Sequence, residues 1–420
     1  MIDALIAIQV FVAILIVIYT VRHYAFTLNR VFGEQRHPYI DVDIATWPSV
    51  TVLIAAHNEE DVIEGSLRCL LAVDYPADKI TLIPVNDRST DRTREIIDAM
   101  VAEFPGRIQP FHREGGRPGK AAALQDAMQF VHTDAIIVFD ADYEPANGLI
   151  HQLMAPLFDP EVGATMGRVV PRNAGASLLT RLLDLERAGG YQVDQQARMN
   201  LRLVPQYGGT VGAIRVKALN SVGGFRVDVL AEDTDLTYRL LLAGWQTVYQ
   251  NRSECYEEVP ETWPVRIRQI MRWTKGHNSA LYSYSWRLLR SSRNSRMARL
   301  DGLLLLGVYM MSPLLLLAWM ASAALLFVER TPLIEGVLGL FAFAAYAALG
   351  NFAAYFQIGA AVRLDGNQRR VRLLPLNQLG FLVSMVAISR ATVSQWIDVL
   401  FKRQMRWDKT LRYRKPGDMS

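Results

Sequence analysis

Cysteine is rare in this sequence, and the patterns that hold a structural zinc ion are missing altogether. The 420 residues contain two cysteines, Cys69 and Cys255, with no C-x-x-C pair and no cluster of histidine with cysteine. These absences exclude a disulfide framework and a zinc-binding domain, and they favour a domain in the reducing cytosol. The formal net charge is only +4, so nucleic acid is not a predicted partner. The sequence also has no internal repeat.

The sequence does contain long apolar runs. Three of them, residues 4–21, 302–328 and 333–362, are each long enough to cross a bilayer. A cleaved signal peptide is the alternative for the first run, but no basic residue precedes it and no small-residue cleavage site follows it. We therefore predict a transmembrane helix over residues 1–24. Basic residues follow this helix, so the positive-inside rule places the next domain in the cytosol, at the inner face of the plasma membrane.

The region after the predicted soluble domain is basic and then apolar. Five arginines occur between residues 287 and 300 without an acidic residue, which predicts a basic helix over 287–300 lying on anionic lipid; a solvated helix face is the alternative. Transmembrane or interfacial helices are expected over 301–400, and a basic tail over 401–420. Polar residues interrupt the run 373–400. A full span there would put the basic tail outside, so we favour a re-entrant or interfacial hairpin.

Residues 47–286 have the alternation typical of an α/β domain. Apolar, β-branched runs predict strands at 50–55, 80–85 and 135–139, and helical spacing predicts helices at 59–71, 89–100 and 120–131. This alternation predicts a largely parallel, Rossmann-like sheet. Ligands bind beyond the carboxyl ends of such strands, and Asp87 and Asp140 lie at two of these ends.

Carboxylates and one lysine near these strand ends indicate a site for a nucleotide diphosphate. Asp140 and Asp142 are alternate residues, which share one face of a strand, and such oxygen ligands suit Mg²⁺ or Mn²⁺ bridging a diphosphate. Asp87 could accept hydrogen bonds from a base or a ribose. Lys120 begins a predicted helix, where a cation is unfavourable unless an anion docks there. Each residue also has an ordinary alternative: an acidic turn for Asp140 and Asp142, a helix cap for Asp87, and a solvated side chain for Lys120.

Two later motifs indicate an acceptor side. Glu232 and Asp233 precede a leucine-rich helix; such acids usually cap helices, but one of them can be the general base toward an acceptor hydroxyl, and we choose Asp233. Gln269 begins the sequence Gln-Ile-Met-Arg-Trp, 36 positions after Asp233. Arg272 can bind a diphosphate bidentately, and Trp273 can stack on a sugar ring. A buried tryptophan with a snorkelling arginine is the alternative.

In their order, D, DxD, ED and QxxRW, these motifs resemble membrane-bound processive glycosyltransferases of family 2, the synthases of cellulose, hyaluronan, chitin oligosaccharides and poly-N-acetylglucosamine. Residues 55–60 look like the nucleotide-site AxNEE motif of that family, and residues 208–213 look like its acceptor-site glycine loop. The resemblance implies an α/β fold in which a cytosolic, Rossmann-like GT-A domain is inserted between transmembrane helices. The implied roles are a catalytic base, Asp233; nucleotide binding by Ala55, His57, Glu59, Asp87, Lys120, Asp140 and Arg272; acceptor binding by Thr210, Glu232, Gln269 and Trp273; and metal binding by Asp140 and Asp142.

The resemblance implies an inverting, metal-dependent, processive enzyme that polymerises a β-linked polysaccharide from a UDP-sugar (a uridine diphosphate sugar). The growing glycan would leave through a channel formed by residues 301–400. UDP-N-acetylglucosamine and UDP-glucose are the first expected donors, and an accessory export subunit is the expected partner of so compact a synthase. Two alternatives stay open: an enzyme that adds one sugar to a lipid or short acceptor, and a transporter whose cytosolic domain senses nucleotide. A sensor needs neither a base nor an acceptor tryptophan, so the transporter has the least support.

Overall fold

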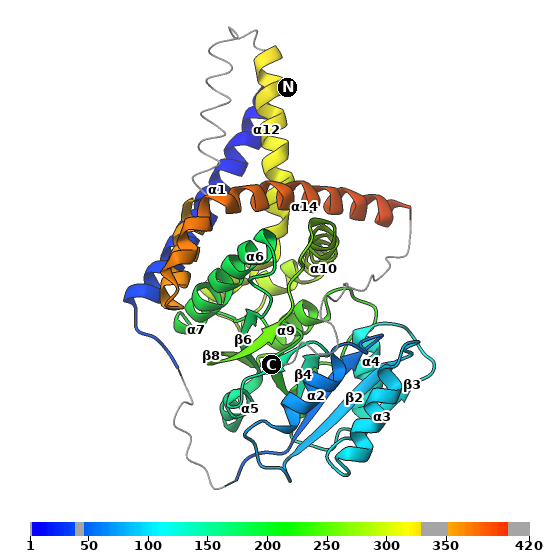
Figure 1. Cartoon of the computed structure of the whole chain (residues 1–420). Helices are drawn as coiled ribbons and strands as arrows, with labels where there is room; N and C mark the ends of the chain where they lie inside the picture. The colour runs from blue at the N-terminus through cyan, green and yellow to red at the C-terminus, as the bar shows by residue number, and fades with distance from the viewer. Residues whose placement is uncertain (1, 38–45, 329–351, 402–420) are drawn as a thin grey trace.

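An α/β domain lies beneath a pair of upright apolar helices. The computed structural model describes residues 2–37, 46–328 and 352–401. The upright helices are α1 (Ile2–Phe32) and α12 (Met311–Val328), and α14 (Asn377–Leu400) crosses between them and the domain (Figure 1).

One eight-stranded sheet forms the centre of the domain, in the order β3-β2-β1-β4-β7-β6-β8-β5. Its strands are β1 (Val50–Ala56), β2 (Ile80–Asp87), β3 (Phe111–Arg113), β4 (Ala135–Asp140), β5 (Glu144–Pro145), β6 (Val162–Pro171), β7 (Gly212–Arg215) and β8 (Gln246–Glu257). The first four strands are parallel, as predicted. The other half is mixed, because β7 runs antiparallel to β4 and β6 and β5 runs antiparallel to β8. Strands β6 and β8 in this half pair in parallel, so the prediction of a largely parallel sheet misses only the antiparallel placement of β7 and β5.

Helices cover both faces of the sheet, which explains why the strands are apolar without alternation. Alternate residues of β1 enter different core clusters. Val52 and Ile54 belong with Leu67 of α2 (Ile63–Leu71), whereas Leu53 belongs with Leu124 of α4 (Lys120–Ala127). The other helices are α3 (Thr93–Glu103), η1 (Met128–Phe130), α5 (Leu149–Met154), η2 (Ala155–Phe158), α6 (Leu178–Ala188), the π-helix η3 (Gly189–Gln195), α7 (Gln196–Asn200), α8 (Val216–Ser221), α9 (Glu232–Ala243), α10 (Trp263–Leu289), α11 (Arg296–Gly307), η4 (Val308–Met310) and η5 (Gln368–Leu376).

The basic helix predicted over residues 287–300 is not a single helix. Arg287 lies in the last turn of α10, Arg290 and Arg293 lie in the following loop, and α11 begins at Arg296. The helix predicted over 120–131 likewise divides into α4 and η1. Cys69 and Cys255 form no disulfide.

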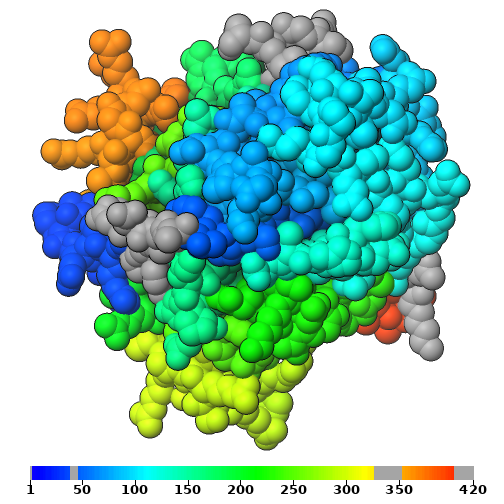
Figure 2. Space-filling view, turned by 90° about the horizontal axis from the view of Figure 1, so that it is seen from below, coloured from blue at the N-terminus to red at the C-terminus, as the bar shows by residue number. Residues whose placement is uncertain are grey.

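Three helical stretches of the described chain, 2–32, 296–325 and 368–400, are long and apolar enough to cross a membrane. Helices α1 and α12 pack on each other through Val12, Ile16 and Ala318. Helix α14 has a different course, since it crosses them in Figure 1; in Figure 2, seen from below, the orange residues that precede α14 and its red end lie at different edges of the molecule. Most of the predicted span 333–362 and the tail 402–420 lie outside the described residues.

Candidate active site

Asp87 ends strand β2 and is held by two arginines. Its Oδ1 accepts hydrogen bonds from Arg113 at 2.7 Å and Arg88 at 2.9 Å, and its Oδ2 accepts from the Gly119 amide at 3.2 Å. His57, another predicted nucleotide residue, contacts the Asp87 carbonyl oxygen through Nδ1 at 2.6 Å. Arg113 was not predicted from the sequence. Its role follows from the strand register, in which Arg113 at the end of β3 is paired with Asp87.

The remaining residues of the predicted nucleotide motif lie at the same edge of the sheet. Ala55 is paired in register with Asp140 across the β1–β4 ladder. Glu59 is buried, and its backbone amide donates to the Thr93 hydroxyl at 2.8 Å. The structure therefore brings Ala55, His57, Glu59 and Asp87 to the carboxyl ends of adjacent parallel strands, as the sequence pattern predicted.

Asp140 and Asp142 differ in their surroundings. Asp140 is the last residue of β4 and is partly exposed, whereas Asp142 lies beyond the strand end and is buried. The strand-alternation argument therefore covers only Asp140. Within the described ranges no group of three or more His, Cys, Asp or Glu side chains forms a ready-made metal site. Two carboxylates still fit Mg²⁺ or Mn²⁺, because such ions commonly take one or two carboxylates and fill the other positions with phosphate oxygens and water.

Lys120 joins the strand-end carboxylates to the glycine loop. Its Nζ lies 2.6 Å from Asp140 Oδ1 and donates to the Gly209 carbonyl oxygen at 2.8 Å. Burial acts to lower the pKa of Lys120, but Asp140 and Glu232 outweigh it and raise the pKa. Burial raises the pKa of Glu232, with Lys120 opposing that change. Lys120 is therefore a partly buried cation that faces both Asp140 at the end of β4 and Glu232 at the start of α9.

The glycine loop lies against the proposed base. Gly209 has φ +73°, and a Cβ added there would lie 2.9 Å from the Asp233 Cβ. Only glycine permits both this backbone conformation and this approach. Thr210, the next residue, accepts a hydrogen bond from the Asp140 amide at 3.2 Å. Asp233 is the second residue of α9, and its Oδ1 accepts from the Thr234 amide at 2.7 Å. Thr210, Asp140 and Asp233 thus meet around this loop.

The QxxRW motif lies on α10. Two arginines pack on the tryptophan ring of this motif. The guanidinium groups of Arg187 and Arg266 each lie over Trp273, 5.4 Å from its ring centroid. Arg266 also donates to Gln269 Oε1 at 2.9 Å. Arg272 is half-buried and has no ion-pair partner among the described residues. Arg187 and Arg266 were missed in the sequence, although Arg266 lies two helical turns before Trp273 and so shares its face.

Helix α10 reaches the acidic motif through Gly276 and His277. A Cβ at Gly276 would lie 2.5 Å from the Cβ of Ala231, the residue before Glu232. His277 lies 3.5 Å from the Thr234 hydroxyl. Burial lowers the pKa of His277, although Asp233 acts to raise it, so the imidazole is neutral at pH 7. His277 was not predicted; its signal is the four-residue spacing from Trp273.

Residues 48–276 match the sequence profile of the family described as "Glycosyltransferase like family 2". This chain belongs to that family. It is 32% identical over 266 residues to the probable glycosyltransferase YdaM of Bacillus subtilis (strain 168), a match that covers 63% of this chain and 62% of that protein. It is 27% identical over 269 residues to glucomannan 4-beta-mannosyltransferase 7 of Arabidopsis thaliana, with coverages of 62% and 48%. The chain thus spans about half to three fifths of the length of these relatives.

The fold has a solved counterpart. The mannosyltransferase PcManGT from Pyrobaculum calidifontis, in complex with GDP-Man and Mn²⁺, superposes with a TM-score of 0.61 at 21% identity, over 89% of this chain and 99% of that chain. This similarity confirms the GT-A, Rossmann-like fold. The predicted resemblance is confirmed at the level of the family. The narrower likeness to cellulose, hyaluronan and chitin synthases is not what these relatives indicate.

Replacing Gly276 by alanine tests the contact between α10 and the acidic motif. We expect Gly276→Ala to lower the free energy of unfolding by about 1–3 kcal/mol, because the added methyl group overlaps the Ala231 side chain. Gly190→Ala is the control, since nothing lies within 4 Å of a Cβ at that helical glycine. It should leave stability unchanged or slightly higher. Chemical unfolding of both detergent-solubilised variants measures this, and equal stability of the two would contradict the packing described.

Proposed function

We propose that this chain is an inverting, metal-dependent hexosyltransferase that moves one sugar from a nucleotide diphosphate donor to a lipid-linked acceptor at the inner face of the plasma membrane. The observation that carries the proposal is the convergence of Asp140, Lys120 and Asp233 on one loop, beside a helix that packs against membrane-side helix α14. Lys275 of α10 forms an ion pair with Asp398 of α14 at 2.8 Å, which joins the acceptor side of the site to α14.

Asp233 is the base in this reaction. Its carboxylate takes the proton of the acceptor hydroxyl as the oxygen forms a bond to the anomeric carbon of the donor sugar. The bond from that carbon to the diphosphate oxygen breaks at the same time, and the nucleoside diphosphate leaves. Attack from the face opposite the leaving group inverts the anomeric configuration. The Thr234 amide donates to this carboxylate, and His277 lies 3.5 Å from the Thr234 hydroxyl.

The donor half neutralises the leaving diphosphate. A divalent cation held by Asp140 and Asp142 would supply positive charge to the diphosphate oxygens. Lys120 brings a second positive charge next to Asp140. Arg272 offers a guanidinium fork that suits a diphosphate, and it has no competing carboxylate among the described residues. Asp87 and His57 are placed for the nucleoside.

Three sugar nucleotides are the candidate donors to assay. UDP-N-acetylglucosamine and UDP-glucose are the donors the motif pattern suggests first. GDP-mannose joins them, because the similar PcManGT structure holds GDP-Man and an Arabidopsis relative is named a mannosyltransferase.

Two features favour a single transfer over polymerisation. The Trp273 ring already carries two guanidinium groups, so a glycan chain would have to displace them to stack there. The described helices α1 and α12 pack on each other, and the apolar stretches 2–32 and 296–325 are largely exposed, so two such helices do not by themselves form a channel wall. A cavity of about 280 Å³ instead lies at the membrane side of the domain, between α1, η3, the helix Phe352–Leu364 and α14.

This cavity supports a lipid-linked acceptor. Its lining is mixed: apolar and small residues such as Ile358 and Phe381 lie beside polar His23, Gln357 and Glu186. The Glu186 carboxylate binds Arg266 at 2.6 Å. Arg266 in turn lies over Trp273. A lipid chain in the cavity would therefore have its head group next to the acceptor motif.

The second candidate is processive polymerisation with export, in which an accessory subunit would complete the channel. The QxxRW motif and the glucomannan synthesis named for a relative favour it.

Replacing Asp233 by asparagine tests the base. We expect Asp233→Asn to lower kcat by about 10²–10⁴-fold, because the amide cannot accept the hydroxyl proton, while donor affinity stays near that of the wild type. Asp228→Asn is the matched control, since Asp228 is an exposed acid paired with Arg226 and should leave kcat unchanged. Nucleotide release and donor binding measure the two quantities. A fully active Asp233→Asn enzyme would rule out this base.

Replacing Asp142 by alanine tests the metal site. We expect Asp142→Ala to weaken Mn²⁺-dependent nucleotide binding by about 10–100-fold, the loss typical when a metal site loses a supporting ligand. Calorimetric titration of the nucleoside diphosphate with and without chelator measures it. Binding by the wild type that is the same in chelator as in Mn²⁺ would contradict a metal role.

Product size separates single transfer from polymerisation. With radiolabelled donor and a membrane lipid extract, we expect a product that carries one added sugar and moves with the lipid in an organic solvent. A ladder or a high-molecular-weight glycan would establish the polymerising enzyme instead.

A further inference from the structure

A closed ring of four charged side chains lies where α1 meets the catalytic domain. Each carboxylate bridges both arginines with one oxygen apiece. Arg22 of α1 lies 2.8 Å from Asp301 Oδ1 and 3.2 Å from Asp194 Oδ1. Arg198 of α7 lies 3.1 Å from Asp301 Oδ2 and 2.9 Å from Asp194 Oδ2. The ring thus joins the N-terminal helix, the π-helix η3, α7 and α11 in one electrostatic unit.

The ring is buried and electrically neutral. The side chains of Arg198 and Asp301 are 3% and 7% exposed. Burial acts to raise the pKa of Asp194, but Arg198 and Arg22 outweigh it and lower the pKa, so this acid is ionised. Removing one member of such a buried set leaves an uncompensated charge, which is strongly unfavourable. The position of Arg22, and hence of α1, is therefore fixed relative to the domain.

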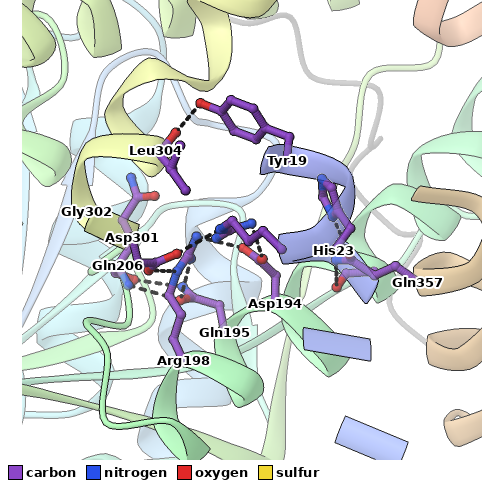
Figure 3. A network of polar contacts seen from close by, with 12 residues as sticks. Tyr19, His23, Asp194, Gln195, Arg198, Gln206, Asp301, Gly302, Leu304 and Gln357 are labelled. Atoms are coloured by element: carbon purple, nitrogen blue, oxygen red, sulfur yellow. Dashed lines mark hydrogen bonds and ion pairs between the residues drawn. The ribbon is translucent and has the colours of Figure 1, made fainter. Parts of the chain in front are cut away.

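From the ring, polar contacts continue to the loop before the glycine motif. Arg198 reaches Gln195 Oε1 at 3.5 Å. The Gln195 side-chain amide then pairs with the backbone of Gln206 in both directions: its Oε1 accepts from the Gln206 amide at 3.0 Å, and its Nε2 donates to the Gln206 carbonyl at 2.9 Å. Figure 3 shows Asp194, Gln195, Arg198, Gln206 and Asp301 in this connected network.

The Gln206 side chain carries the network to the proposed base. Its Nε2 donates to the Thr234 hydroxyl at 3.1 Å and lies 3.4 Å from His277 Nε2. Thr234 directly follows Asp233 and donates its amide to that carboxylate. His277 lies on the acceptor helix, one turn after Trp273, whose carbonyl oxygen it contacts at 3.2 Å. Gln206 therefore contacts the helix of the base and the helix of the acceptor motif at once.

We propose that Gln195 and Gln206 are positioning residues for Asp233, and that the ion-pair ring makes this positioning depend on how membrane helix α1 is seated. The inference rests on the proposed role of Asp233 as the base. The π-helix supports it: π-helical turns are rare and frequently lie at functional sites, and here that turn carries both Asp194 and Gln195. Seating α1 correctly in the membrane would thus favour an aligned base.

Gln206→Ala is the first test, with Gln192→Ala as its matched control. Gln192 is a buried glutamine of the same π-helix whose side chain bonds Asn251, Asp365 and, at 3.4 Å, Arg30 of α1. It therefore also contacts α1, but its side chain does not bond Gln206 or Thr234. We expect Gln206→Ala to lower kcat about tenfold or more, as misplacing a catalytic group does, with donor KM within about twofold of wild type. Gln192→Ala should keep kcat. Nucleotide release from whichever of UDP-glucose, UDP-N-acetylglucosamine and GDP-mannose the wild type uses measures both.

A double-mutant cycle between Arg22 and Gln206 tests the dependence on α1. Arg22→Lys keeps the positive charge, but a single ammonium group cannot bridge two carboxylates as the guanidinium fork does. We expect Arg22→Lys to lower kcat without raising donor KM, and the double variant to lose no more than the worse single variant, because both changes act along one path. Independent, multiplying losses would overturn the link to α1.

Backbone hydrogen exchange decides the inference without relying on turnover. We expect residues 232–237, the first turn of α9, to exchange faster in Gln206→Ala and Arg22→Lys than in wild type, and unchanged in Gln192→Ala. The positioning role would be overturned if these residues exchanged at the wild-type rate in Gln206→Ala. Equal loss of kcat in Gln206→Ala and Gln192→Ala would overturn it as well. If Asp233→Asn is fully active, the proposed base fails, whereas the exchange result still decides whether the network holds this turn.

Discussion

The site depends on one partly buried cation, Lys120. Lys120 bonds to Asp140 at the end of β4 and to the backbone of the glycine loop, and it faces Glu232 at the start of α9. Carboxylates gathered in a poorly solvated cleft raise one another's pKa, and an opposite charge is needed to keep them ionised. The lysine supplies that charge and at the same time ties the donor half of the site to the acceptor half. The spacing between Asp140 and Asp233, which lie on either side of the glycine loop, is therefore set by an electrostatic need as much as by packing.

The elements that were predicted most accurately from the sequence are those that local residue patterns determine. Strands β1, β2 and β4 have uninterrupted apolar runs, and α4 and α9 begin at the charged residues singled out for chemistry, so these elements could be placed within a few residues. The antiparallel course of β7 could not be predicted, because the pattern of a four-residue strand does not indicate in which direction its neighbour runs. Arg187 was out of reach for a related reason. Its position over Trp273 results from the packing of α6 against α10, whose ion pair joins residues 80 positions apart.

The failed prediction of a basic helix shows how arginines can have structural uses that composition hides. Ser295 caps α11, accepting a hydrogen bond from the Ala298 amide at 3.1 Å, and so begins a new helix within the basic segment. Arg293 donates to the Ala243 carbonyl at 3.0 Å and Arg299 to the Leu289 carbonyl at 2.9 Å. Both carbonyls lie at helix ends, where cations are favourable. Part of the charge that suggested a lipid surface is therefore used to end helices.

The three arginines near the acceptor motif are distinguished by their partners. Arg187 pairs with Glu257 at 2.6 Å and Arg266 with Glu186 at 2.6 Å, so each carries its own counter-charge and together they add no net attraction for an anion. Arg272 has no such partner in the part of the chain that is described. A half-buried guanidinium without a counter-ion is unfavourable in isolation and becomes favourable when an anion arrives. This asymmetry supports our proposal that Arg272 binds the donor diphosphate, whereas Arg187 and Arg266, whose charges are already balanced, shape the surroundings of Trp273.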